Sequence, residues 1–185
     1  EAKRSVLQQS FANEDEFLKS LQMKCEVKSF DNFIIPRIAQ LSQRSNQFNL
    51  RTIRYTEEEI AAIAVSAMHF SLSFTLQDIY GDYGLISFII LEKKTSDTLF
   101  IDSWIMSCRV LKRGMELFAL SCIIGLAIKH GYKKITGQYI PTKKNGLVKD
   151  HFKKLGFLQV NDENWELDLG EGSILSSIKT NILKN

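Results

Sequence analysis

The sequence contains few of the residues that mark specialised classes of protein. Its 185 residues include only 3 cysteines, 2 prolines and 3 histidines. The cysteines, Cys25, Cys108 and Cys122, have no CxxC spacing and cannot all pair, so a disulfide-rich scaffold is not expected. Because the sequence has no Cys/His cluster either, we expect no metal in this domain. Free thiols are typical of a reducing compartment, which predicts a cytoplasmic protein.

The chain also lacks a long hydrophobic run and a strong excess of one charge. Its longest apolar stretch, residues 117–128, is too short to cross a bilayer. The 24 basic and 21 acidic side chains leave a formal net charge of +3, so neither nucleic acid nor a membrane is expected as a partner. With 44% hydrophobic residues, a chain of this length can bury a full core in one domain.

What the sequence does contain is an ordered series of helical and strand patterns. Thr56 and Glu59 form a capping box at the start of one predicted helix, and Gly131 closes a long apolar one. Between these two helices, a meander of three strands is joined by short loops. The predicted helices cover residues 14–21, 36–45, 57–67, 114–130 and 146–155, and the predicted strands residues 25–30, 50–55, 70–76, 85–91, 99–108, 134–139 and 157–169.

Residues 108–114 (CRVLKRG), here called the basic turn, connect a long strand to the apolar helix. Amide groups at the start of a helix attract anions, and Gly114 lets a ligand approach the backbone. Arg109, Lys112 and Arg113 add positive charge that a phosphate or pyrophosphate would meet. A solvated basic loop is the alternative, and the strand–turn–helix order favours the anion site.

Two motifs resemble those of the GCN5-related N-acetyltransferase (GNAT) fold. Arg109-x-x-Lys112-x-Gly114 is similar to its R/Q-x-x-G-x-G/A signature, and residues 152–157 (FKKLGF) are similar to its closing Y-x-x-x-G-F motif. The resemblance implies an α/β (α+β) domain over residues 22–185, with a mixed central sheet flanked by helices. In that family the turn holds the pyrophosphate of acyl-coenzyme A, so Arg109, Lys112, Arg113 and Gly114 are implied as cofactor-binding residues.

The sequence departs from these motifs at two positions. Lys112 replaces the first glycine of the signature, and Phe152 replaces the tyrosine that often acts as general acid toward the leaving thiolate. A phenyl ring cannot donate that proton. An ordinary amine acetyltransferase is therefore less expected than the fold itself.

A closer resemblance is to the C-terminal part of FkbH-like proteins. The blocks that carry it are residues 46–49 (NQFN), 54–55 (RY), 78–85 (DIYGDYGL), 107–111 (SCRVL) and 141–145 (PTKKN), in the order of that family. The resemblance implies an upstream HAD-type phosphatase domain in the same chain, to which a helix within residues 1–21 would be the linker. It also implies transfer of a glyceryl group from 1,3-bisphosphoglycerate to the thiol of an acyl carrier protein, with phosphopantetheine or acyl-CoA as the cofactor.

Three residues are candidates for catalysis. Cys108 could hold the acyl group as a thioester, because thiolates attack acyl phosphates and thioesters well; the alternative is a small apolar residue at the end of a strand. His151 could shuttle a proton beside the missing tyrosine, although on a helix we expect it to face solvent. Asp78 could act as a base or simply form the turn at residues 78–84.

Other polar residues are candidates for binding. In the 46–49 block, Asn46, Gln47 and Asn49 could offer hydrogen bonds to substrate hydroxyls, or merely form a turn. Arg54 could meet a carboxylate or phosphate, or stand exposed on a strand. Lys144 and Asn145 could hold a pantetheine phosphate or an acidic carrier protein, or belong to a basic capped loop. Two competing functions are a conventional acetyl-CoA-dependent N-acetyltransferase and a non-catalytic module that docks a carrier protein.

Overall fold

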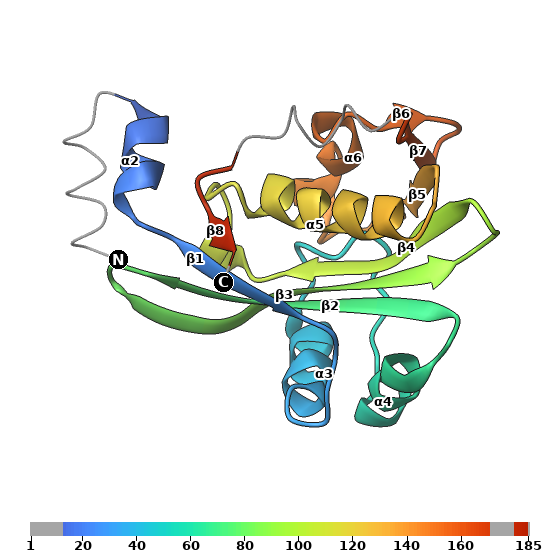
Figure 1. Ribbon diagram of the computed structural model, residues 1–185, viewed down its shortest axis with the longest axis horizontal. Helices are drawn as coiled ribbons and strands as arrows, with labels where there is room; N and C mark the ends of the chain where they lie inside the picture. The colour runs from blue at the N-terminus through green and yellow to red at the C-terminus, as the bar shows by residue number, and fades with distance from the viewer. Residues whose placement is uncertain (1–12, 171–179, 185) are drawn as a thin grey trace.

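The structure is a computed structural model that describes residues 13–170 and 180–184. Its centre is an eight-stranded mixed sheet with helices on both faces (Figure 1), in the strand order β6-β7-β5-β4-β3-β2-β1-β8. The predicted α/β class with a mixed, helix-flanked sheet is thus confirmed. The strands are β1 (Lys24–Lys28), β2 (His69–Asp78), β3 (Gly81–Lys93), β4 (Thr98–Met106), β5 (Lys134–Gln138), β6 (Leu158–Gln159), β7 (Asn164–Asp168) and β8 (Leu183–Lys184). The helices are α2 (Glu14–Ser20), α3 (Ile35–Arg44), α4 (Glu57–Val65), α5 (Met115–Lys129) and α6 (His151–Lys154), with short 3-10 turns η1 (Cys108–Val110) and η2 (Gly146–Val148).

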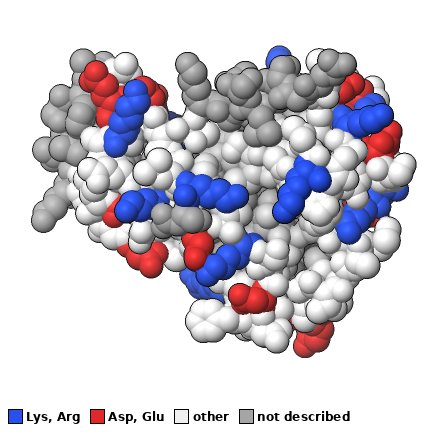
Figure 2. Space-filling model, in the orientation of Figure 1, with Lys and Arg blue, Asp and Glu red and all other residues white. Residues whose placement is uncertain are grey.

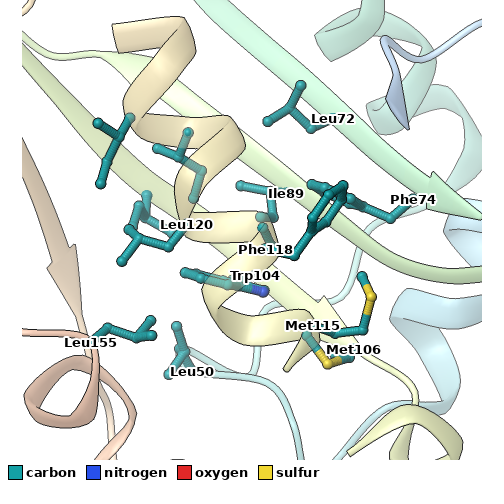
Figure 3. Close-up of a cluster of buried hydrophobic side chains, with 14 of the residues drawn as sticks. Leu50, Leu72, Phe74, Ile89, Trp104, Met106, Met115, Phe118, Leu120 and Leu155 are labelled. Atoms are coloured by element: carbon teal, nitrogen blue, oxygen red, sulfur yellow. The ribbon is translucent and has the colours of Figure 1, made fainter. Parts of the chain in front are cut away.

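The sheet separates two hydrophobic layers. Helices α5 and α6 lie on one face and α3 and α4 on the other (Figure 1). Successive side chains of a strand point to opposite faces, so Ile89 of β3 belongs to the α5 layer and Phe88 and Ile90 to the α3 layer. In the α5 layer, Trp104 of β4 lies near Phe118 of α5 (Figure 3). Both faces of the central strands are covered, which explains why their sequences read as nearly continuous apolar runs.

The two parallel central strands, β4 and β5, separate partway along their length. Their pairing runs from Thr98↔Lys134 to Ile101↔Gly137. Strand β4 continues to Met106, whereas β5 ends at Gln138. We call the opening between residues 102–106 and the chain that follows β5 the fork. Asp102 begins it as a bulge residue, since Ile90 of β3 pairs with Ser103 and Leu91 with Ile101.

Local end signals are confirmed where the structure describes them. The predicted Thr56–Glu59 capping box is complete, and Asn13 likewise caps α2 by accepting a hydrogen bond from the Asp15 amide. Gly131 has the left-handed conformation expected after α5, with a φ of 80°.

Three predicted elements are wrong in type or extent. Residues 50–55 are not a strand, because the Asn49 side chain accepts the Thr52 amide and donates to the Ile53 carbonyl, which turns the chain back. Thr52 itself has a φ of 57°. The helix predicted over residues 146–155 is divided into η2 and α6, and the strand predicted over 157–169 is divided into β6 and β7.

The N-terminal helix packs on this domain. Phe17 of α2 and Leu21 after it are 2% and 0% exposed and belong to the α5 layer. Residues 14–21 therefore contribute to the core, while their service as a linker to an upstream domain stays a prediction. Residues 1–12 of that predicted linker lie outside the described part of the chain.

Candidate functional site

The basic turn leaves the end of β4 and leads directly into α5. The Ser107 amide donates to the Ile86 carbonyl at 2.8 Å, which keeps the chain against β3 until the turn begins. Lys112 and Gly114 then adopt left-handed conformations with φ of 60° and 76°. Gly114 caps α5 without a side-chain hydrogen bond, while in the first turn of the helix the Glu116 carboxyl accepts a hydrogen bond from its own amide. Within the basic turn, the exposed side chains are those of Cys108, Arg109 and Lys112.

Arg113 and Asp78 need correction as site residues, because they pair with each other inside the protein. The Arg113 side chain is 2% exposed and the Asp78 side chain 0%, with Nη1 3.1 Å from Oδ2. The Arg113 guanidinium also lies 4.5 Å from the ring centroid of Tyr83, whose hydroxyl donates to the same Asp78 oxygen. The buried Arg113 guanidinium therefore does not present its charge to a phosphate, and the buried Asp78 carboxylate is not placed to act as a base on a substrate.

His151 is buried, so the expectation that it faces solvent is wrong. Its ring packs edge-on against Trp104 at 4.5 Å and against Phe48 at 5.0 Å. Burial lowers the pKa of His151 to about 3, so the imidazole is neutral at pH 7. Its Nε2 has no hydrogen-bond partner among the described residues. These surroundings do not suit a proton shuttle.

The position of the missing tyrosine is filled by an apolar ring. Phe152 is 1% exposed and stands over Gly137 of β5. A Cβ added to that glycine would lie 2.2 Å from the Phe152 Cζ, so the ring occupies the space of a side chain on β5.

Asn49 and Asn145 also need correction, because both are buried and bonded to backbone. They are 1% and 0% exposed. The Asn145 Nδ2 donates to the carbonyls of Asn49 and Ile140 at 3.0 and 2.9 Å, and its Oδ1 accepts the Thr142 amide at 2.7 Å. The side-chain amides of Asn49 and Asn145 therefore bond to backbone groups of the loops and are not available to a ligand.

The remaining predicted binding residues are accessible. Arg54 is exposed and its Nη2 donates to the Asn46 Oδ1 at 2.5 Å, so these two side chains lie together. Gln47 and Lys144 are exposed. Their roles toward a substrate or a carrier stay predictions. Basic and acidic side chains are interspersed on the face seen in Figure 2.

Sequence reasoning missed a polar cluster at the base of the fork. Arg51 Nη1 lies 2.6 Å from the Asp102 Oδ1 and 2.9 Å from the Asp102 carbonyl, while its Nε donates to the Gln138 Oε1 at 3.2 Å. The Tyr55 hydroxyl donates to the other Asp102 oxygen, and burial raises the pKa of this tyrosine. The signal that could have revealed the cluster is Asp102 itself, the one charged residue of a mostly apolar strand.

The described residues form no group of three or more His, Cys, Asp or Glu side chains suited to a metal ion. Within the same residues, no helix has the length and apolarity to span a bilayer.

Comparisons with known proteins identify the fold. No protein-family model matches the chain, and no curated protein matches it in sequence. Among solved structures, the GNAT domain of S. lividans PAT is similar with a TM-score of 0.61 and 14% identity, covering 77% of this chain and 89% of that one. A domain from Methanocaldococcus jannaschii has a TM-score of 0.62 and 14% identity, covering 80% and 99%. The Vibrio cholerae spermidine N-acetyltransferase in complex with CoA and spermine has a TM-score of 0.58 and 10% identity, covering 80% and 95%. The chain therefore has the GNAT fold.

Proposed function

We propose that this chain is an acyltransferase domain of FkbH type, which passes a glyceryl-type acyl group to the thiol of an acyl carrier protein or of coenzyme A. The GNAT fold and the ordered FkbH-like sequence blocks support this proposal. The observation that carries it is the position of Cys108. Of the three cysteines, Cys108 alone is exposed, and it lies at the start of the basic turn.

The other two thiols are poor nucleophiles in this structure. Burial raises the pKa of Cys25 to about 12 and also raises the pKa of Cys122, which disfavours the reactive thiolate at neutral pH. Cys108, in contrast, is exposed to solvent. An electrophile arriving from solvent would therefore meet Cys108 first.

The proposed reaction has two steps, acylation of Cys108 and transfer of the acyl group to the acceptor thiol. The Cys108 thiolate attacks the acyl carbon of an acyl phosphate; a C–S bond forms, the C–O bond to phosphorus-bound oxygen breaks, and phosphate leaves with the electron pair. Arg109 and Lys112, together with the first amides of α5, would meet that phosphate. The thiolate of the acceptor then attacks the thioester, and Cys108 leaves as a thiolate. The acyl carrier protein and an upstream HAD-type phosphatase domain belong to this proposal as partners.

A conventional CoA-dependent N-acetyltransferase is the second candidate, favoured by the fold of the Vibrio cholerae enzyme above. That reaction usually needs a group to protonate the leaving thiolate. Phe152 cannot do so, and the buried neutral His151 beside it is cut off from solvent. We therefore rank this candidate second.

Mass spectrometry of the intact protein distinguishes the two candidates. Incubation with 1,3-bisphosphoglycerate should add one acyl group that hydroxylamine removes, as expected for a thioester. Cys108→Ser should lose this adduct, whereas the matched control Cys122→Ser should keep it. An adduct that survives in Cys108→Ser, or turnover of acetyl-CoA on an amine such as spermidine without any adduct, would overturn the proposal.

A further inference from the structure

The fork between β4 and β5 is filled by the chain itself. Asn49 pairs antiparallel with Ile105 of β4, and the Met106 amide donates to the Phe48 carbonyl at 3.4 Å. On the other side, the Ile140 amide donates to the Leu50 carbonyl at 2.9 Å. Residues 48–51, here called the inserted segment, thus lie between the two separated strands, with a single β-bridge at Asn49 and bends on either side of it.

Side chains of the inserted segment also close the space beneath α5 and α6. Phe48 and Leu50 are 4% and 2% exposed and belong to the α5 layer. The Phe48 ring packs against His151 of α6 at 5.0 Å. Leu50 lies in the same cluster as Trp104 and Leu155 (Figure 3). The segment is therefore part of the hydrophobic core and not a loop resting on its surface.

Polar contacts hold the inserted segment at both ends. At the base of the fork, Arg51 joins Asp102 of β4 to Gln138 of β5. At the open end, the Asn145 side chain donates to the carbonyls of Asn49 and Ile140. Because Phe48, Asn49 and Leu50 are buried and the backbone of the segment is hydrogen-bonded on both sides, release of the segment would break the core packing and both sets of polar contacts together.

This closure bears on how a thiol substrate reaches the domain. A pantetheine arm is extended and carries two amide groups, so an open strand edge beside the basic turn would suit it by the same pairing that binds peptides to sheet edges. We propose that the inserted segment permanently takes that place, so that no pantetheine arm enters the fork and the acceptor thiol meets the acyl group on Cys108 at the protein surface. The second half of this statement rests on the proposed function, whereas the closure does not.

Hydrogen exchange on the unmodified protein tests the closure. The amides of Met106 and Ile140 should exchange slowly, and their rates should not change with added CoA or pantetheine. Binding of either probe in the fork should be weaker than a Kd of about 1 mM. CoA that slows exchange at Met106 and Ile140, or that binds more tightly there, would show that the fork admits the arm and would overturn the inference.

A disulfide between the inserted segment and β4 tests whether the segment ever moves. Asn49 and Ile105 face each other as a non-hydrogen-bonded antiparallel pair, since the Met106 amide donates to the Phe48 carbonyl. The Cα atoms of such a pair are about 4.5 Å apart, which is close enough for a disulfide. The Asn49→Cys/Ile105→Cys variant, oxidised with Cys108 confirmed free, should load and transfer the acyl group within about twofold of its phosphine-reduced form. Loss of transfer by more than tenfold, restored by reduction, would overturn the inference.

The two proposals fail separately. If Cys108 takes up no acyl group but CoA leaves the fork amides unchanged, the proposed function is wrong and the closure stands. If Cys108 is acylated while CoA enters the fork, the closure is wrong and the proposed function stands.

Discussion

The buried pair of Asp78 and Arg113 offers a quantitative test of structural against catalytic roles. Replacing Asp78 with alanine leaves the Arg113 guanidinium in the interior without its anion, and it removes the acceptor of the Tyr83 hydroxyl and of the Tyr80 amide. Removing one partner of a buried ion pair typically costs about 3–5 kcal/mol. The Arg113 Nε is already without a hydrogen-bond partner among the described residues, and the Tyr83 ring beside the guanidinium carries no charge that could replace the lost anion. We expect Asp78→Ala to lower the free energy of unfolding by about 3–5 kcal/mol.

A double-mutant cycle isolates the pair. Arg113→Met removes the buried cation while keeping an unbranched apolar stem, so the double variant Asp78→Ala/Arg113→Met should cost less than the two single changes summed, by about 2 kcal/mol. Urea denaturation followed by tryptophan fluorescence measures all four proteins. Asp82→Ala is the matched control: Asp82 is exposed in the same turn and, within the described part of the chain, accepts a hydrogen bond from the Gly84 amide alone, so its loss should cost about 1 kcal/mol or less.

Either of two outcomes would refute this reasoning. If Asp78→Ala unfolds at the same urea concentration as the unchanged protein but no longer loads an acyl group, Asp78 acts in catalysis and its burial has been misjudged. Additive costs in the cycle would equally show that the two side chains do not depend on each other.

Two further predictions concern His151 and Gly137. Burial lowers the folded pKa of His151 to about 3, against an unfolded value of about 6.5, so the unfolded state binds more protons between these values. The free energy of unfolding should therefore fall as the pH falls below about 6.5, by about 2 kcal/mol at pH 5. His151→Leu should not show this loss. Equal pH dependence of urea unfolding in the two proteins would contradict the prediction. Gly137→Ala places a Cβ 2.2 Å from the Phe152 Cζ and should destabilise by about 1–3 kcal/mol in thermal unfolding. The control Gly125→Ala, in α5 with nothing within 4 Å of the new Cβ, should be neutral or stabilise by up to about 1 kcal/mol, and an equal response of the two variants would contradict the close packing.

Sequence by itself determined the order and type of most elements, because their signals are local. The capping box at Thr56, the apolar run of α5 and the left-handed Gly131 each depend on residues within a few positions of one another. The motifs around the basic turn and Phe152 then pointed to the GNAT fold. These signals were enough for the architecture and for placing Cys108 at a strand–helix junction.

Only the tertiary structure decided which polar residues are available to a ligand. Lys112 and Arg113 are neighbours of the same charge, yet Lys112 is exposed, while Arg113 turns inward toward a carboxylate 35 positions away. No local pattern distinguishes the two residues, because the buried cation is stabilised by a carboxylate from a distant part of the chain.

The fork shows the same limit more sharply. Arg51 pairs with Asp102, which is 51 positions later in the sequence. The Asn145 side chain donates to the carbonyl of Asn49, which is 96 positions earlier. Residues 50–55 alternate like a strand, but residues 48–51 instead bond to the backbone beside the separated ends of β4 and β5, through one isolated bridge at Asn49 and hydrogen bonds of Phe48 and Leu50. Pairings over such distances depend on the whole fold, so the sequence could name the fold but not what fills the gap in its sheet.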